Sequence, residues 1–281
     1  LITPSQPALI SSCIEMSEYA LPRKLNSAQA ASRRFSDAAR DYDHHARVQK
    51  HSAQHLCQWL DQMLPLNFKP NACVDVGSGT GFLTEHLLNK FPQSAVHAVD
   101  LAQGMLTELK RKYPTERLHT HLLNGEELAV EHLWIPNHSL LVSGMCAQWF
   151  SNIEEAIRRW LSVSNTVVFS VLLAGSFQAW EVAHEDTGQT SGLRPLPSDE
   201  QLKQIMHALV AEGIAAHTAH HTKNFLDHHP DGLSFARSLR AIGADQPRVN
   251  HTPVNLRKVI NALGEACTMN YHIGFYYLER P

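Results

Sequence analysis

Three glycines at alternate positions, Gly77, Gly79 and Gly81, follow a short apolar stretch at 72–76. A leucine-rich helical pattern begins at Leu83, so the glycines join a strand to a helix. A side chain at Gly77 or Gly79 would occupy the space of a ligand lying against the main chain, so this turn favours a ligand site. The alternative is an ordinary strand-to-helix loop.

The rest of the chain alternates between strand and helix patterns. Apolar and β-branched stretches predict seven strands, at 72–76, 95–99, 118–123, 139–143, 166–172, 214–222 and 271–278. Helical spacing predicts helices at 33–64, 83–91, 102–112, 153–161, 175–186, 202–213, 233–242 and 252–263. The alternation predicts an α/β fold: a seven-stranded, mostly parallel sheet with helices on both faces, and ligands beyond the carboxyl ends of the strands.

Short polar patterns mark the starts of three helices. Ser151 with Glu154, and Ser198 with Gln201, match the capping box, in which two side chains satisfy main-chain N–H groups reciprocally. Thr252 is expected to cap the last helix, with the following proline in its first turn.

Length and composition predict one large domain and exclude several functions. We expect residues 1–30 to form a flexible N-terminal extension, and 31–281 a single domain with a helical insertion at about 175–212 on the acceptor side. The net charge of −3 does not favour binding to nucleic acid, and no apolar run has the length of a membrane span. The N-terminus lacks a secretory signal, and five scattered cysteines read as reduced thiols, so we expect a cytoplasmic protein. The paired histidines diverge on a helix or strand, so no metal site is expected.

The glycine turn resembles motif I of the class I S-adenosylmethionine (SAM) methyltransferases. Phe82 stands where a dinucleotide fingerprint has its third glycine, and Asp75 stands shortly before the first. The resemblance implies a Rossmann-like fold and SAM as cofactor. It implies a cofactor site made of Gln49, Asp75, Gly77, Ser78, Gly79, Gly81, Asp100, Leu101, Met105, Asn124, Gly125 and Ser143.

Polar residues at strand ends have assigned roles in this site. Asp100 ends the second strand, where a carboxylate accepts hydrogen bonds from ribose hydroxyls; a helix N-cap is the alternative. Leu101 and Met105 are expected beside the adenine, although core packing also explains Met105. Asn124 is expected near the adenine amino group, where class I enzymes usually have Asp. Ser143, Gly144, Met145 and the segment 146–149 end the fourth strand and are expected to face the methyl donor and the acceptor.

Further segments resemble the malonyl-acyl-carrier-protein O-methyltransferases of biotin synthesis. Residues 34–49 match the family pattern Phe-x-x-Ala-Ala-x-x-Tyr-x-x-x-Ala-x-x-Gln, and 143–149 resemble Ser-Asn-x-x-x-Gln-Trp. Residues 170–177, 237–244 and 271–272 resemble Phe-Ser-Thr-Leu-x-x-Gly-Ser-Leu, Ser-Leu-Lys-x-Ile-Gly-Ala and the Tyr-His of its closing Thr-Tyr-His strand. The likeness covers roughly residues 33–280.

Three segments depart from the family pattern. Leu128-Ala129 replaces Leu-Pro, 162–165 replaces an Arg-x-x-x-Pro-Gly-Gly turn, and 191–195 replaces His-x-Asn-x-Phe. The last segment is expected near the acceptor, so the departures bear on the substrate more than on the fold.

The resemblance implies methyl transfer to a malonyl carboxylate without a general acid or base. The carboxylate is ionised at neutral pH, so the chain has to position it and exclude water. A carboxylate pairs well with the fork of an arginine, so Arg194 and Arg237 are candidates, although both also fit a solvated surface. Trp149, His45 and Tyr42 complete the expected acceptor-positioning set.

The implied partner is malonyl-acyl-carrier protein, with malonyl-CoA left open. Carrier proteins are acidic, and two basic groups are available to dock one. They are Arg33, Arg34, Arg40, Arg47 and Lys50, and Arg237, Arg240, Arg248, Arg257 and Lys258. Two alternatives remain: a SAM methyltransferase with another small acceptor, and a methyltransferase-like binding protein without turnover.

Overall fold

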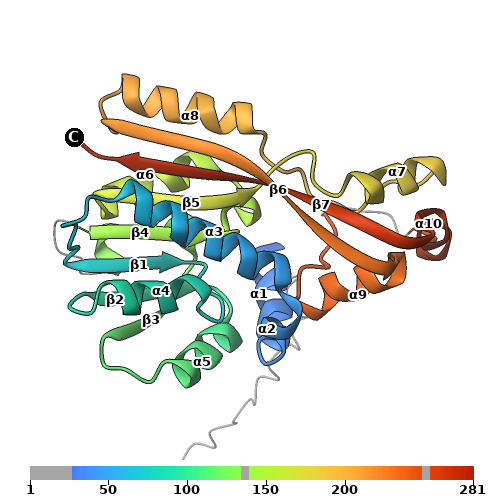
Figure 1. Cartoon of the computed structure of the whole chain (residues 1–281), viewed down its shortest axis with the longest axis horizontal. Coiled ribbons are helices and arrows are strands. Elements are labelled where there is room, and N and C mark those ends of the chain that lie inside the picture. The colour runs from blue at the N-terminus through green and yellow to red at the C-terminus, as the bar shows by residue number, and fades with distance from the viewer. Residues whose placement is uncertain (1–26, 134–138, 249–253) are drawn as a thin grey trace, which may run out of the picture.

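The computed structural model describes residues 27–133, 139–248 and 254–281, and its strands form one sheet (Figure 1). The order is β3-β2-β1-β4-β5-β7-β6. The strands are β1 (Ala72–Val76), β2 (Ala95–Asp100), β3 (Leu118–Leu122), β4 (Ser139–Gly144), β5 (Thr166–Leu172), β6 (His217–Asp231) and β7 (Glu265–Glu279). β1 to β5 pair in parallel, and β7 runs antiparallel between β5 and β6. The predicted seven-stranded, mostly parallel sheet is therefore confirmed.

Helices cover both faces of this sheet. The α-helices are α1 (Ser27–Ala38), α2 (Tyr42–His45), α3 (Arg47–Met63), α4 (Phe82–Lys90), α5 (Gln103–Lys112), α6 (Ile153–Val163), α7 (Gln178–Asp186), α8 (Asp199–Ala211), α9 (Gly232–Ala241) and α10 (Leu256–Leu263). Short 3-10 turns are η1 (Gly125–Glu127), η2 (Val130–His132) and η3 (Ala147–Trp149). Apolar residues of α3, α4 and α5 share one core with the sheet, and those of α6 and α8 share another.

The two cores use opposite faces of the same strands. All of β1 is buried, because Cys73 packs in the α3–α5 core while Val74 and Val76 pack in the α6–α8 core. Trp160 of α6 is fully buried, and its indole N–H donates to the carbonyl of Gly125 at 2.9 Å. This hydrogen bond holds the loop after β3 at the carboxyl end of the sheet.

The predicted single helix at 33–64 is wrong, because the chain turns twice and forms α1, α2 and α3. The hydroxyl of Ser32 on α1 donates to the carbonyl of Leu101 at 2.6 Å, and the N–H of Gly104 on α5 donates to the Ser36 hydroxyl at 3.2 Å. α1 therefore packs on α5 and the end of β2, while α3 packs on the sheet. One straight helix cannot reach both places.

The last two strands are longer than predicted, since β6 and β7 each have 15 residues. β6 lies at the edge of the sheet and pairs only with β7, so polar side chains at 223–231 are tolerated and hide the strand pattern. Both strands run past the parallel ones, and α7, α9 and α10 pack around their extended ends (Figure 1). α8, predicted within the helical insertion, covers the sheet face instead.

The capping predictions had mixed outcomes. Ser198 and Gln201 form the predicted capping box of α8. The box at Ser151 is wrong: Asn152 caps α6, because its side chain accepts from the N–H of Glu155. Thr252 lies outside the described residues, as do 1–26, and α10 begins at Leu256 with Asn255 as its cap.

Candidate active site

The glycine turn joins β1 to α4 in a conformation that suits glycine. Gly77, Gly79 and Gly81 have φ angles of 69°, 54° and 103°, in the region that other residues rarely adopt. A Cβ at Gly81 would collide with Leu109, whereas one at Gly79 meets nothing within 4 Å. Only Gly79 therefore leaves the space in front of the turn open.

The expectation for Gly77 needs a correction. A Cβ there would collide with the side chain of Cys146, which follows β4. In this structure the missing side chain makes room for a protein neighbour, and Cys146 thus lies against the turn. Burial, followed by the nearby Asp100 and Asp75, raises the pKa of this thiol far above its ordinary value, so Cys146 is protonated.

Asp75 lies beneath the turn with one oxygen free. Its Oδ2 accepts from the Thr84 hydroxyl at 2.6 Å, but its Oδ1 is buried and has no partner. The buried hydroxyl of Ser78 has none either. Burial raises the pKa of Asp75 to about 7, although the Thr84 hydrogen bond opposes the shift. Buried orphan groups such as these indicate a site for a polar ligand.

Asp100 holds the other side of the turn. One of its carboxylate oxygens accepts from the Gly79 N–H and the other from the Ala102 N–H, both at 2.8 Å. Burial raises its pKa, and these main-chain donors partly oppose the rise. The N-cap alternative for Asp100 is wrong, because Ala102 is the N-cap residue of α5; the Asp100 side chain instead accepts from the N–H of that residue and from Gly79 in the turn.

The short helix α2 closes over the turn. Asp43 accepts from the Thr80 hydroxyl and, at 2.7 Å, from the ammonium of Lys112, which also donates to the Thr80 carbonyl at 2.9 Å. Tyr42 stacks obliquely near Phe82, with ring centroids 6.1 Å apart. Burial and the nearby Asp100 raise the pKa of Tyr42, so its phenol stays protonated.

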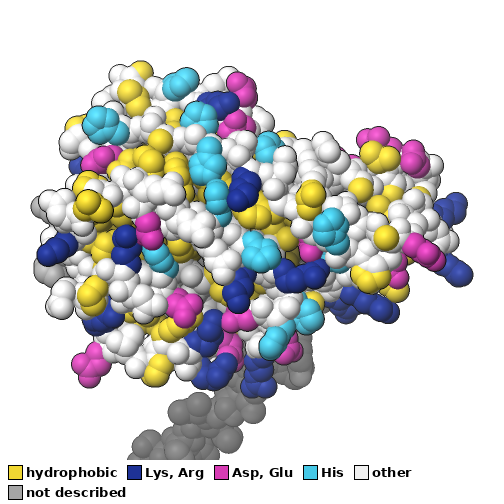
Figure 2. All heavy atoms as spheres, viewed as in Figure 1, with side chains coloured by type: hydrophobic (Ala, Val, Ile, Leu, Met, Phe, Trp, Pro, Cys, Tyr) yellow, Lys and Arg dark blue, Asp and Glu magenta, His cyan; other side chains and the backbone are white. Residues whose placement is uncertain are grey.

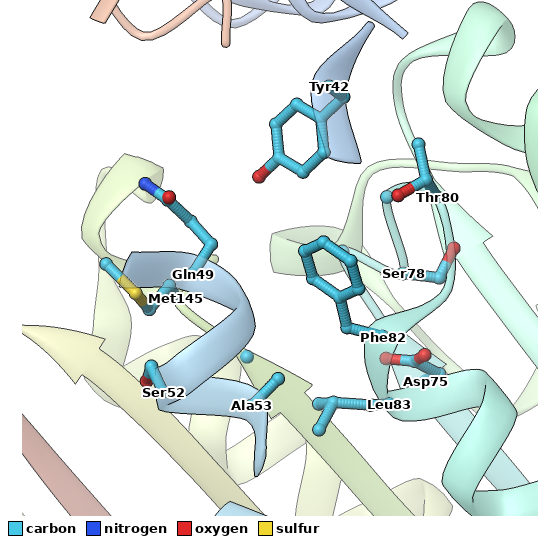
Figure 3. Close-up of a pocket in the computed structure, with 13 residues that line it drawn as sticks. Tyr42, Gln49, Ser52, Ala53, Asp75, Ser78, Thr80, Phe82, Leu83 and Met145 are labelled. Carbon is cyan, nitrogen blue, oxygen red and sulfur yellow. The ribbon is translucent and has the colours of Figure 1, made fainter. Parts of the chain in front are cut away.

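These groups enclose a small cavity, which we call the glycine-turn pocket. Its lining residues are Tyr42, Gln49, Ser52, Ala53, Asp75, Gly77, Ser78, Gly79, Thr80, Phe82, Leu83, Gly144 and Met145 (Figure 3). Figure 3 shows the Phe82 ring in the middle of it, with Tyr42 above and Thr80 and Gln49 on opposite sides. The volume is about 40 Å³, which holds only a few water molecules.

A larger cavity of about 520 Å³ lies beside it, and we call this the arginine cavity. Tyr42, Gln49 and Met145 line both, so they form a shared wall. The walls are mainly apolar and come from η3, α7 and α9, with segments before α8 and after α9. The lining includes Phe35, Trp149, Leu172, Phe177, Trp180, His184, Leu193, Arg194, Leu196, Leu233, Arg237, Leu239, Arg240, Ile242 and Tyr271.

Three arginines line this cavity, Arg194, Arg237 and Arg240, and none has an ion pair with a described residue. Arg194 is half-buried and its guanidinium lies over the Trp149 ring, 5.4 Å from the centroid. Arg237 and Arg240 are exposed and stand three residues apart on α9, so they share one face of that helix. Unpaired cations at an apolar cavity indicate an anionic ligand.

The structure brings together part of the predicted site. Of the predicted cofactor residues, Gln49, Asp75, Gly77, Ser78 and Gly79 line the glycine-turn pocket. The predicted acceptor residues Tyr42, Trp149, Arg194 and Arg237 line the arginine cavity, but His45 is exposed on α2 and lines neither cavity.

Other predicted residues have structural partners. The Asn124 side chain accepts from the N–H of Glu126 and caps η1, while Ser143 is buried and donates to the Val76 carbonyl at 2.8 Å. Gly125 packs where a Cβ would collide with Val76. Leu101 accepts from Ser32, and Met105 is buried between α1 and α5.

The sequence analysis gave no role to Thr84 or to the Asp43–Lys112 pair, which support the turn. Cys146 was expected only as part of the segment after the fourth strand, and Arg240 only as part of a basic docking group, whereas the structure places Cys146 against Gly77 and Arg240 in the arginine cavity. Among the described residues no cluster of three or more metal-ligating side chains has the geometry of a metal site, and no helix is long and apolar enough to cross a bilayer.

Known proteins match both the sequence and the fold. A family model described as a methyltransferase domain matches residues 73–165. A malonyl-acyl-carrier-protein O-methyltransferase from Neorickettsia risticii is 30% identical over 247 residues, covering 88% of this chain and 94% of that protein. One from Priestia megaterium is 32% identical over 59% of each chain. The biotin biosynthesis bifunctional protein BioCD from Bordetella avium is 24% identical over 90% of this chain, which spans 53% of that protein.

A solved structure extends the match to the fold. The plantazolicin methyltransferase BpumL, in complex with SAH, covers 90% of this chain and 95% of its own with a TM-score of 0.51 and 13% identity. The sheet order, the glycine turn after β1 and Asp100 at the end of β2 define a class I SAM-dependent methyltransferase, as predicted. Within that class, the chain belongs to the malonyl-acyl-carrier-protein O-methyltransferase family.

Proposed function

We propose that the protein methylates the free carboxylate of a malonyl thioester carried by an acyl-carrier protein, an early step of biotin synthesis. The observation that carries the proposal is the wall of Tyr42, Gln49 and Met145 between the glycine-turn pocket and the arginine cavity. Methyl transfer needs donor and acceptor in line and in contact, and two sites that share one wall meet that need. The malonyl-acyl-carrier-protein O-methyltransferase relatives support the substrate, and the biotin biosynthesis protein of Bordetella avium supports the pathway.

The glycine-turn pocket offers groups that suit the donor. Asp75 has an unpartnered oxygen for a cation such as the donor's α-ammonium, Ser78 has a free hydroxyl, and Gly79 exposes main chain. The pocket of about 40 Å³ is much smaller than SAM, so we expect α2 and the rings of Tyr42 and Phe82 to move when it binds.

The proposed methyl transfer requires no acid or base catalyst from the protein. SAM supplies a methyl group already activated on its sulfonium, so no acid or base is needed for transfer to a carboxylate oxygen. The protonated Tyr42 and Cys146 are unsuited to act as bases. The residues of the shared wall instead have to orient the carboxylate and exclude water, which can supply up to ~7–11 kcal/mol in model reactions.

Arg194 is the residue we assign to the acceptor carboxylate. The residue is half-buried, its guanidinium lies over the Trp149 ring, and it has no ion pair with a described group. A planar fork binds a carboxylate through two parallel hydrogen bonds, which the ammonium of lysine cannot reproduce. We therefore expect Arg194→Lys to raise KM for the acceptor about tenfold and Arg194→Gln to raise it further, with SAM affinity unchanged by calorimetry.

Of the two basic groups, the C-terminal one suits the carrier protein better. Arg237 and Arg240 line the arginine cavity, and Arg257 and Lys258 follow on the exposed surface of the adjacent α10. Lys and Arg side chains gather over α9 and α10 in Figure 2. In the N-terminal group, by contrast, Arg34 and Arg47 are already paired with Asp245 and Asp227.

Charge reversal distinguishes these two surfaces. Arg257→Glu with Lys258→Glu, which lie on α10 outside the cavity lining, should raise KM for malonyl-carrier protein at least tenfold, because the carrier is acidic. Arg33→Glu with Arg40→Glu, on the N-terminal group, is the matched control and should change KM little. The opposite pattern would move the docking surface to α1. Neither pair should change KM for a malonyl thioester without a carrier protein.

The function itself is tested by incubating the protein with SAM and malonyl-carrier protein, with malonyl-CoA in parallel. Mass spectrometry should detect the methyl ester of the carrier-bound acid. SAM binding without a methyl ester would refute the proposed acceptor, and methylation of another small carboxylic acid would identify the replacement. Absence of SAM binding would indicate a non-catalytic protein. Growth of a biotin-requiring strain that lacks its own methyltransferase tests the pathway, and the cytoplasmic location stays a prediction.

A further inference from the structure

His184 is a buried histidine that lines the arginine cavity. The proposed methyl transfer gives it no role. His184 lies near the end of α7, is only 2% exposed, and lines the cavity together with Trp180 of the same helix. The rings of His184 and Trp180 meet edge to face, with centroids 4.7 Å apart. A histidine in such apolar surroundings requires hydrogen-bond partners for its ring nitrogens.

One ring nitrogen has its partner, and that partner fixes the tautomer. Nδ1 lies 2.8 Å from the main-chain carbonyl of Trp180. A carbonyl oxygen only accepts, so Nδ1 carries the hydrogen and donates it. The neutral ring then has its lone pair on Nε2, and no group in the described parts of the chain pairs with Nε2. His184 therefore offers the cavity a fixed hydrogen-bond acceptor.

The helix end holds this acceptor in place. The carbonyl of His184 accepts from the Gln189 N–H at 2.8 Å and from the Thr187 hydroxyl at 3.1 Å. The imidazole is thus fixed by its own Nδ1 bond and by the Trp180 ring, while the main chain is fixed by the turn after α7. A side chain with locked orientation can select one arrangement of a bound molecule.

An acceptor complements the three arginines of this cavity; the Asp245 carboxylate, which also lines it, is already paired with Arg34. Arg194, Arg237 and Arg240 are donors and cations, so they recognise an anion but cannot receive an N–H. The arm that carries an acyl group on a carrier protein has amide N–H groups along its length. A malonyl unit alone would leave most of a cavity of about 520 Å³ unfilled, so the arm has room to enter.

We propose that His184 is a positioning residue, whose Nε2 accepts a hydrogen bond from an amide N–H of the thioester arm. The inference rests on the proposed function. It implies that the arginine cavity recognises the arm as well as the carboxylate, and that acceptors without the amide bind less well.

The test compares two acceptors that differ in the amide. Malonyl-pantetheine keeps the amide groups, and the malonyl ethyl thioester has none. His184→Phe retains a ring against Trp180 but removes the acceptor, so KM for malonyl-pantetheine should rise about five- to tenfold with little change in kcat. KM for the ethyl thioester should stay the same. His184→Gln, whose terminal oxygen reaches near the position of Nε2, should recover most of the loss.

A control and two opposite outcomes make the test decisive. His207→Phe, on the exposed side of α8, should change neither KM value. Equal losses of His184→Phe on both acceptors, or no rescue by glutamine, would show a packing role and overturn the inference. Lack of methyl transfer by the wild-type protein to malonyl-carrier protein and to both thioesters, with SAM still bound, would instead refute the proposed function.

Discussion

The substitution Gly104→Ala on α5 tests whether α1 packs directly against α5. A Cβ added there would fall among the main-chain atoms of Ser36, with its Cα and carbonyl carbon at 2.7 and 2.8 Å. Main chain cannot rotate away as a side-chain end can. Gly104→Ala therefore has to push α1 off α5, and with it the hydrogen bonds from Ser32 to Leu101 and from Gly104 to Ser36.

Gly104→Ala is expected to destabilise the protein, although the same change would stabilise an isolated helix. Alanine in place of glycine inside a helix stabilises it by about 1 kcal/mol. Against this, overpacking costs about 1–3 kcal/mol and the two lost hydrogen bonds about 1 kcal/mol each. The net expectation is a destabilisation of about 2–4 kcal/mol, with weaker SAM binding because α2, which follows α1 in the chain, lines the glycine-turn pocket through Tyr42.

Urea unfolding followed by circular dichroism measures the change. Gln103→Ala, at the neighbouring exposed position, is the matched control and should stay within about 0.5 kcal/mol of wild type. A Gly104→Ala protein that is more stable than wild type would show that α1 does not pack on α5, and the arrangement of the covering helices would have to be abandoned.

Three further predictions concern buried polar groups. The pKa of Asp75 is raised to about 7, and a cationic donor favours its ionised form. The affinity for SAM, measured by calorimetry, should therefore fall roughly tenfold from pH 7.5 to pH 6. Asp75→Asn should bind SAM weakly at both pH values, and an unchanged pH dependence in that variant would argue against the assignment. Burial, with the neighbouring His121, lowers the pKa of His97 to about 4, so the unfolded chain takes up a proton more readily than the folded one. The free energy of unfolding should therefore fall by about 1–2 kcal/mol as the pH falls from 6.5 towards 4. Urea unfolding of His97→Gln should show a smaller fall over this range, and an equal fall would contradict this cause. Trp160→Phe leaves the buried carbonyl of Gly125 unpaired and should cost about 1–3 kcal/mol in the same assay, whereas a neutral effect would mean that water replaces the indole.

The parallel part of the fold was accessible from sequence because its signals are local. β1, β4 and β5 are short, mostly apolar, buried runs, and the three alternate glycines have φ angles that only glycine adopts readily. The extended β6 was missed beyond 222 because an edge strand needs no apolar alternation, and its length comes from pairing with β7.

The site was only partly accessible, because its walls come from contacts distant in sequence. Nothing in the local pattern of Gly77 indicates that Cys146 will lie against it, or that Asp43 will reach Thr80 and Lys112. Arg194 and Arg237 were chosen by charge and resemblance. Their common cavity arises only when α7, α9 and the segment before α8 pack together beyond the parallel strands.

Tyr42 belongs to a helix of four residues, and its ring borders both cavities. A movement of α2 that admitted or released the methyl donor would therefore open the arginine cavity at the same time. The two reactants of the proposed reaction would then share one exit.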